Sequence, residues 1–113
     1  MAAIAKLLLL ALVVISTVNA RSLGNGPNGD TLFEVRVKNV CPCSVRNVRI
    51  DGRGFDTTLA VDPSLFRAEG GGIYLVNGGG RIASLATVSF MYSWDHDFQL
   101  TPKSLEVEED RCY

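Results

Sequence analysis

Residues 31–51 read TLFEVRVKNVCPCSVRNVRID, and their alternation of apolar and polar side chains decides the fold. In the first eight residues apolar positions alternate with charged or polar ones. Successive side chains of a strand point to opposite faces, so this spacing is typical of a half-buried antiparallel strand. The pattern returns later in the stretch, with Val48 and Ile50 facing inward. Val45 is out of phase with Val48, which predicts a β-bulge or a strand start between them.

The rest of the chain continues as short segments separated by glycine-rich turns. Residues 62–67 predict a helical turn, with Asp62 as its cap and Pro63 at its first position. Asn77-Gly78 is typical of a hairpin turn. No segment after residue 20 has the 3.6-residue apolar period of a helix, so the sequence predicts an all-β fold, an antiparallel β-sandwich of about seven short strands. The further strands are expected over residues 55–61, 73–76, 82–94, 98–100 and 105–107.

Residues 1–20 have the features of a cleaved secretory signal peptide. Lys6 supplies the positive charge, and residues 7–15 form an unbroken apolar run. Small residues precede the expected cut between Ala20 and Arg21. The apolar run is shorter than the roughly 20 residues of a membrane-spanning helix. We therefore expect a secreted protein that acts in the extracellular space or apoplast.

After the signal peptide the sequence predicts a flexible glycine-rich arm over residues 21–30 and a single β-sandwich domain over residues 31–113. The formal net charge is −1, and no basic stripe or run is present. This composition argues against nucleic acid as a partner. The charged C-terminal residues contain no second apolar tail, so no membrane anchor is expected.

Three cysteines, Cys41, Cys43 and Cys112, are the disulfide candidates. A bridge from Cys112 to either of the others closes a loop of about 70 residues, worth about 4 kcal/mol in the chain-entropy description. Cys41-Pro42-Cys43 lacks the spacing of zinc knuckles and of thioredoxin-like redox motifs. The count is odd, so one thiol is left over, and it could link two copies in a disulfide-bonded homodimer.

No combination of residues predicts catalysis, a metal ion or a cofactor. His96 is the only histidine and stands between Asp95 and Asp97, too few ligands for a metal site. Cys41 with His96 would be the remaining nucleophile and base, but a free thiol is usually oxidised in an extracellular protein. We expect a protein that is not an enzyme.

An aromatic cluster surrounds this histidine. Tyr92, Trp94, His96 and Phe98 are the candidate partner-binding residues. If Tyr92 and Trp94 face inward, they belong to the core. If they lie on an outer sheet face, they would suit stacking on sugars or a hot spot for a protein partner.

From residue 39 onward the chain resembles the plant tapetum determinant family of small secreted signalling proteins. The resemblance rests on the order and spacing of short motifs along about 75 residues, nearly the whole of the predicted domain. These motifs are Asn39-Val40-Cys41, Gly54-Phe55, Asp62-Pro63 with Phe66-Arg67, Leu75-Val76-Asn77-Gly78-Gly79, Val88-Ser89-Phe90-Met91-Tyr92, Phe98, and Ser104-Leu105 leading to Cys112.

The resemblance implies an extracellular ligand of a leucine-rich-repeat receptor kinase, which helps to specify cell fate in the anther and its tapetum. It implies no catalysis and no cofactor. Better-known members carry two further cysteines, near Asp51 and around residues 72–74, and both are missing here. The alternative function is a secreted carbohydrate-binding module, in which Tyr92 and Trp94 stack on cell-wall polysaccharide.

Overall fold

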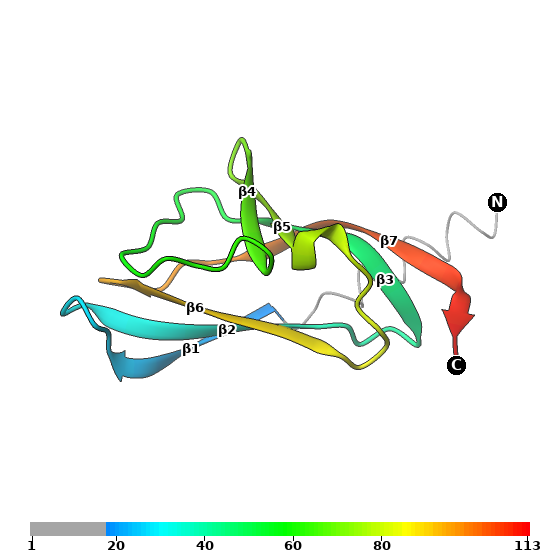
Figure 1. The fold of residues 1–113 in the computed structure, drawn as a ribbon, viewed down its shortest axis with the longest axis horizontal. Helices are drawn as coiled ribbons and strands as arrows, with labels where there is room; N and C mark the ends of the chain where they lie inside the picture. Colours follow the sequence, from blue (N-terminus) through cyan, green and yellow to red (C-terminus); the bar gives the residue numbers. More distant parts are fainter. Residues whose placement is uncertain (1–17) are drawn as a thin grey trace.

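The computed structural model describes residues 18–113, so most of the predicted signal peptide lies outside the described residues. Two antiparallel sheets pack face to face (Figure 1). The three-stranded sheet has the order β1 (Val18–Asn25), β2 (Thr31–Lys38), β6 (Thr87–Trp94). The four-stranded sheet has the order β4 (Phe66–Gly70), β5 (Ile73–Val76), β3 (Cys43–Asp51), β7 (Thr101–Cys112). The predicted all-β antiparallel sandwich is confirmed.

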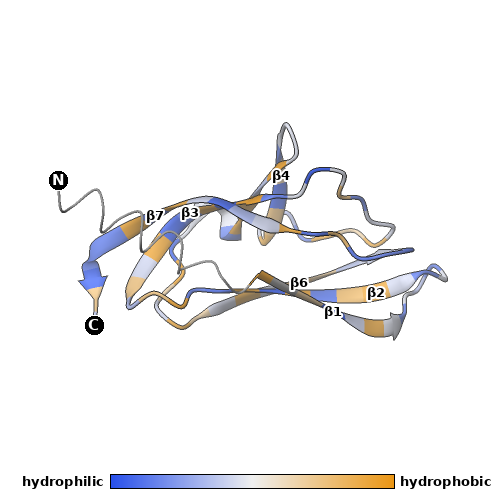
Figure 2. Ribbon diagram, turned by 180° about the vertical axis from the view of Figure 1, so that it is seen from behind, coloured by the Kyte–Doolittle hydropathy of each residue, from blue (hydrophilic) through white to orange (hydrophobic). Residues whose placement is uncertain are grey.

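The alternation along β2 and β3 places one apolar row of each strand between the sheets. Figure 2 shows hydrophobic and hydrophilic residues alternating along β2. The β-bulge expected between Val45 and Val48 is present, because the register of β3 against β7 shifts between Arg46 and Arg49. Asn47 takes the left-handed φ of 50° that this shift requires. Val45 and Val48 are therefore both buried although they are three residues apart.

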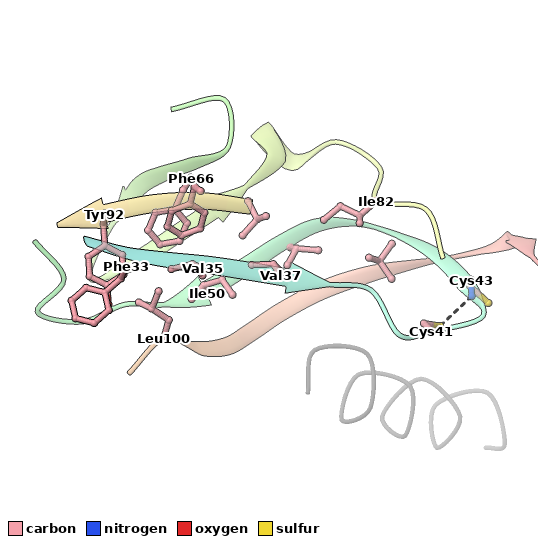
Figure 3. Packing of buried hydrophobic residues seen from close by; sticks show 14 residues of the cluster. Phe33, Val35, Val37, Cys41, Cys43, Ile50, Phe66, Ile82, Tyr92 and Leu100 are labelled. Carbon is pink, nitrogen blue, oxygen red and sulfur yellow. Dashed lines mark hydrogen bonds between the residues drawn. The ribbon is translucent and has the colours of Figure 1, made fainter. Parts of the chain in front are cut away.

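Aromatic rings fill one half of the core, and aliphatic side chains fill the other (Figure 3). Phe66 of β4 stacks on Phe90 of β6 with ring centroids 4.2 Å apart, which joins the two sheets. Phe55 contacts four rings edge-on or tilted: Phe66, Tyr74, Tyr92 and Phe98. Such contacts add about 0.5–1.5 kcal/mol per pair to the area that they bury.

Some local predictions were wrong. The segment over residues 55–61 is a loop: Phe55 packs against the core, and the backbone hydrogen bond from Thr58 to Ser93 of β6 does not extend into a ladder. The hairpin turn between β4 and β5 lies at Gly71-Gly72, where positive φ angles favour glycine. Asn77–Gly79 instead forms the short 3-10 helix η1. Ile82 precedes β6 and makes only an isolated bridge to Val45.

The flexible arm expected over residues 21–30 is not seen. Residues Val18–Asn25 form β1, which pairs with β2 through a bulge between Ser22 and Gly24. Glycines weaken a strand, but β2 offers a free edge to which this segment can bind. The expected cut after Ala20 falls inside β1 and would remove its first three residues.

The chain passes between the sheets three times, and the side chain of Asn39 fastens two of these crossings. Asn39 is 2% exposed and lies between β2 and β3. Its amide nitrogen donates to the carbonyl of Cys43 at 2.9 Å and to that of Ile82 at 3.0 Å, and its amide oxygen accepts from the backbone N–H of Cys41 at 2.9 Å. Ile82 belongs to the crossing from β5 to β6, so one amide holds both crossings together.

The disulfide joins Cys43, at the start of β3, to Cys112, at the end of β7. Cys41 is free and 1% exposed, and its sulfur accepts a hydrogen bond from the backbone N–H of Cys43 at 3.3 Å (Figure 3). A buried sulfur cannot reach a second chain while the fold is intact, so the structure offers no support for a disulfide-linked homodimer through this thiol.

We predict that Asn39→Ala lowers the free energy of unfolding by about 3 kcal/mol, because three hydrogen bonds to buried backbone groups are lost. Urea denaturation of the purified protein measures the loss. Asn28→Ala is the matched control: its amide donates one exposed hydrogen bond, to the carbonyl of Thr58, and its loss should cost less than about 1 kcal/mol. Equal effects of the two substitutions would contradict the role of Asn39.

We predict that Cys112→Ser lowers the free energy of unfolding by about 4 kcal/mol, because the unfolded chain is no longer cross-linked over 69 residues. Urea denaturation with and without reductant measures the effect. Reductant should destabilise the wild type by a similar amount and leave Cys112→Ser unchanged. A variant that reductant destabilises further would indicate that another cysteine pair has formed.

Candidate functional site

The loop between β6 and β7 is the third crossing between the sheets, and it carries the candidate partner-binding residues. It follows Trp94, the last residue of β6, and ends before Thr101, the first of β7. His96 is exposed, while Trp94 and Phe98 are half-buried. Tyr92 has no exposed surface. The structure therefore brings three of the four residues together at one end of the sandwich and places the fourth beneath them.

Tyr92 belongs to the core and supports the loop from below. Its ring lies 5.1 Å from that of Phe33 and 5.1 Å from that of Phe55. Its hydroxyl accepts a hydrogen bond from the backbone N–H of Phe98 at 3.0 Å. Burial raises the pKa of Tyr92 above its ordinary value, the hydrogen bond from Phe98 lowers it, and the nearby charge of Asp97 raises it further.

This position decides between the two alternatives for Tyr92. A sugar-stacking platform made of Tyr92 and Trp94 needs both rings on an outer face, and Tyr92 faces the core. Alternate residues of a strand, such as Tyr92 and Trp94, lie on the same face. The sequence alone could not tell whether this face of β6 points into the core or away from it. The inward alternative holds for Tyr92 because its ring completes the aromatic half of the core.

The remaining residues form a ridge in which half-buried aromatic rings lie beside exposed acidic groups, and we call it the 94–98 ridge. The ring of Phe98 lies 6.3 Å from that of Trp94 and 5.0 Å from that of His96. His96 Nδ1 lies 2.7 Å from Asp95 Oδ1. Partly exposed aromatic rings next to carboxylates offer apolar contact area and hydrogen-bond acceptors at once, a combination suited to a protein partner.

Beside the ridge lies an open hollow of about 450 Å³. Its lining includes residues that the sequence did not indicate as binding residues: Gln99 and Leu100 from the loop, and Val18 and Ala20 from β1. No sequence signal could have identified the last two, since they read as the end of a signal peptide. The expected cut after Ala20 would remove that wall of the hollow.

The structure separates Cys41 and His96, the two residues considered as a nucleophile and its base. Cys41 follows the end of β2, and His96 follows the end of β6. Because Thr31 pairs with Trp94 while Lys38 pairs with Thr87, these two ends lie at opposite ends of the ladder. Within residues 18–113 no three His, Cys, Asp or Glu side chains gather in an arrangement that could hold a metal ion.

A carboxylate at the other end of the sandwich is held in its charged form. Arg81 binds Glu108 through two hydrogen bonds of 2.7 and 3.0 Å, and these lower the pKa of Glu108. The pair joins the segment before β6 to β7 and serves the fold.

In the described part of the chain, no helix has the length and apolar character needed to cross a bilayer.

Comparisons with known proteins agree on one plant family. The sequence profile of the family described as Tapetum determinant 1, C-terminal, matches residues 14–108. TPD1 protein homolog 1B of Oryza sativa subsp. japonica is 36% identical over 97 residues, which are 85% of this chain and 56% of that protein. An uncharacterized protein of Arabidopsis thaliana is 40% identical over 75 residues, 64% of this chain and 58% of that protein. The chain thus spans less than two thirds of either relative, and no solved structure matches it.

We predict that Tyr92→Phe changes both the stability and its dependence on pH. At pH 7 the variant loses the hydrogen bond to Phe98, which costs about 1 kcal/mol. The raised pKa of Tyr92 means that the folded wild type keeps a proton that the unfolded chain loses near pH 10. The stabilisation of the fold by the protonated phenol of Tyr92 is therefore fully present below pH 10 and is lost as the pH rises above that value.

Urea denaturation of both proteins from pH 7 to pH 11 measures this difference. The stability of Tyr92→Phe should fall less steeply above pH 10, so that the two profiles approach each other. Parallel profiles would contradict the burial of an ionisable phenol at this position.

Proposed function

This chain belongs to the Tapetum determinant 1 family, and on that premise we propose that it is a secreted protein ligand for the ectodomain of a leucine-rich-repeat receptor kinase. In this proposal it helps to specify anther and tapetal cell fate, as the resemblance implies. The observation that carries the proposal is the family match over residues 14–108, which covers β1 to β6 and most of β7.

Two features of the chain support an extracellular place of action. The residues before β1 have the composition of a signal peptide, and the fold contains the Cys43–Cys112 disulfide. Disulfides form and persist mainly in oxidising compartments. A bridge that fixes the last strand of the sandwich would keep a small domain folded outside the cell.

We further propose that the 94–98 ridge makes the contact with the receptor. Binding residues are concentrated on loops that a rigid scaffold positions, and Tyr92 holds this loop through its hydroxyl. Trp94 and Phe98 supply aromatic contact area, and His96 with Asp95 supplies the polar rim. None of these groups needs to perform chemistry for this role.

The experiment is titration calorimetry of the purified secreted protein against a panel of leucine-rich-repeat ectodomains. We predict that at least one binds, and that Trp94→Ala weakens its affinity at least tenfold, because an aromatic anchor at the centre of a contact costs about 2 kcal/mol or more when truncated. His96→Ala should weaken binding less and leave folding intact, since this side chain is exposed.

Leu85→Ala is the matched control, because Leu85 is 56% exposed and precedes the opposite end of β6. Its affinity should equal that of the wild type, and circular dichroism should show all variants folded. If the protein binds no ectodomain of the panel, the ligand role is overturned. Binding that Trp94→Ala and His96→Ala leave unchanged would overturn the contact surface alone. Retention on cellulose or xylan that Trp94→Ala abolishes would favour the carbohydrate-binding alternative.

A further inference from the structure

Three of the four edge strands of this sandwich carry features that oppose pairing with another chain. β7 contains Pro102 and four acidic side chains. β4 is five residues long, carries charges at Arg67 and Glu69, and has a register irregularity. β1 is bulged between Ser22 and Gly24. Charges, proline, short length and bulges are the means by which natural proteins keep sheet edges from associating.

β6 is the fourth edge strand, and it has none of these features. Its sequence, TVSFMYSW, contains no charge, no proline and no glycine. Thr87, Ser89 and Met91 are exposed, and Met91 is an apolar side chain with 46% of its surface accessible. Uncharged strands rich in β-branched and aromatic residues pair readily with other strands.

The backbone of β6 also leaves its outer edge open. The backbone N–H of Asn39 donates to the carbonyl of Ala86, which therefore points to the side of β2. The backbone N–H of Thr58 donates to the carbonyl of Ser93, which points to the side away from β2. Alternate residues of an antiparallel ladder turn their N–H and C=O groups to the same side. Thr87, Ser89 and Met91 therefore direct theirs to the outer edge, where the order of the described strands places no neighbour. The loop at Thr58 covers only the Ser93 end.

We propose that the outer edge of β6 pairs in antiparallel fashion with β6 of a second copy of this chain, so that two three-stranded sheets become one sheet of six strands. The two-fold axis passes midway between the two Ser89 residues. In this register each Ser89 lies opposite its equivalent, and each Thr87 lies opposite Met91 of the second copy. All three outward-facing residues of each chain then exchange backbone hydrogen bonds.

The occupant is a second copy because the edge is complementary to itself. An isologous contact places the same surface on both sides, so it requires that no like charges meet, and residues 87–94 carry none. The two ends of the strand also differ in charge. Lys38 pairs with Thr87 at the first end, and Asp95 follows Trp94 at the second. Antiparallel pairing sets the basic end of one copy beside the acidic end of the other.

Cross-linking with single cysteines tests the register in the full secreted protein. Two directly opposite residues that exchange hydrogen bonds have Cα atoms about 5.5 Å apart, which suits a disulfide. Ser89→Cys should therefore give a covalent dimer on non-reducing electrophoresis. Thr87→Cys is the matched control on the same edge, and it should stay monomeric because the two positions lie roughly 13 Å apart along the ladder.

Analytical ultracentrifugation tests the association without a cross-link. The wild type should dimerise with rising concentration, and Ser89→Lys should weaken this association at least tenfold, because two like charges then face each other across the axis. Thr101→Lys, which adds the same charge to an exposed position of β7, should leave it unchanged.

A wild type that remains monomeric, or equal cross-linking of Ser89→Cys and Thr87→Cys, would overturn the proposal. So would a monomeric wild type whose binding to another protein is lost in Ser89→Lys, since the edge would then accept a foreign strand. These outcomes are separate from receptor binding, which the 94–98 ridge variants measure.

Discussion

The amide of Asn39 is the interaction on which the arrangement of the two sheets depends. A sandwich needs the chain to leave one sheet and enter the other, and backbone groups lose their ladder partners wherever it does so. The side chain of Asn39 makes hydrogen bonds to three backbone groups within one buried site. Because a buried polar group without a partner is costly, this side chain fixes where β2 ends and β3 begins. At the same end of the molecule, the disulfide links the last residue of β7 to the first residue of β3.

The opposite end of the sandwich is organised by an aromatic residue. Tyr92 combines a ring that fills the core with a hydroxyl that reaches the backbone of Phe98. The same residue thus stabilises the fold and positions the 94–98 ridge. The two ends are consequently built differently: a polar lock and a disulfide at one, and an aromatic core beneath an exposed loop at the other. Aromatic side chains are partly exposed at the second of these ends.

The missing cysteines of this chain acquire a structural meaning. The resemblance expects them near Asp51 and around residues 72–74, and Asp51 lies opposite Ile73 across β3 and β5. Two cysteines at such positions would be cross-strand neighbours, within reach of one disulfide. In this chain the pairing of β3 with β5 rests on backbone hydrogen bonds and packing. The remaining bridge, at the end of the sheet, is the one that closes the longer loop.

The sequence by itself determined the fold class, the inward rows of β2 and β3, the bulge before Val48 and the family, because these depend on local periodicity and on the order of motifs. It could not determine the loop after Phe55, the strand β1, which of two cysteines pairs with Cys112, or the burial of Tyr92. Each of these depends on which segments become neighbours. Only the tertiary structure decided that Tyr92 lies beneath Phe98 and that the edge of β6 is open, because a strand has two faces and two edges, and packing selects which of them meets water.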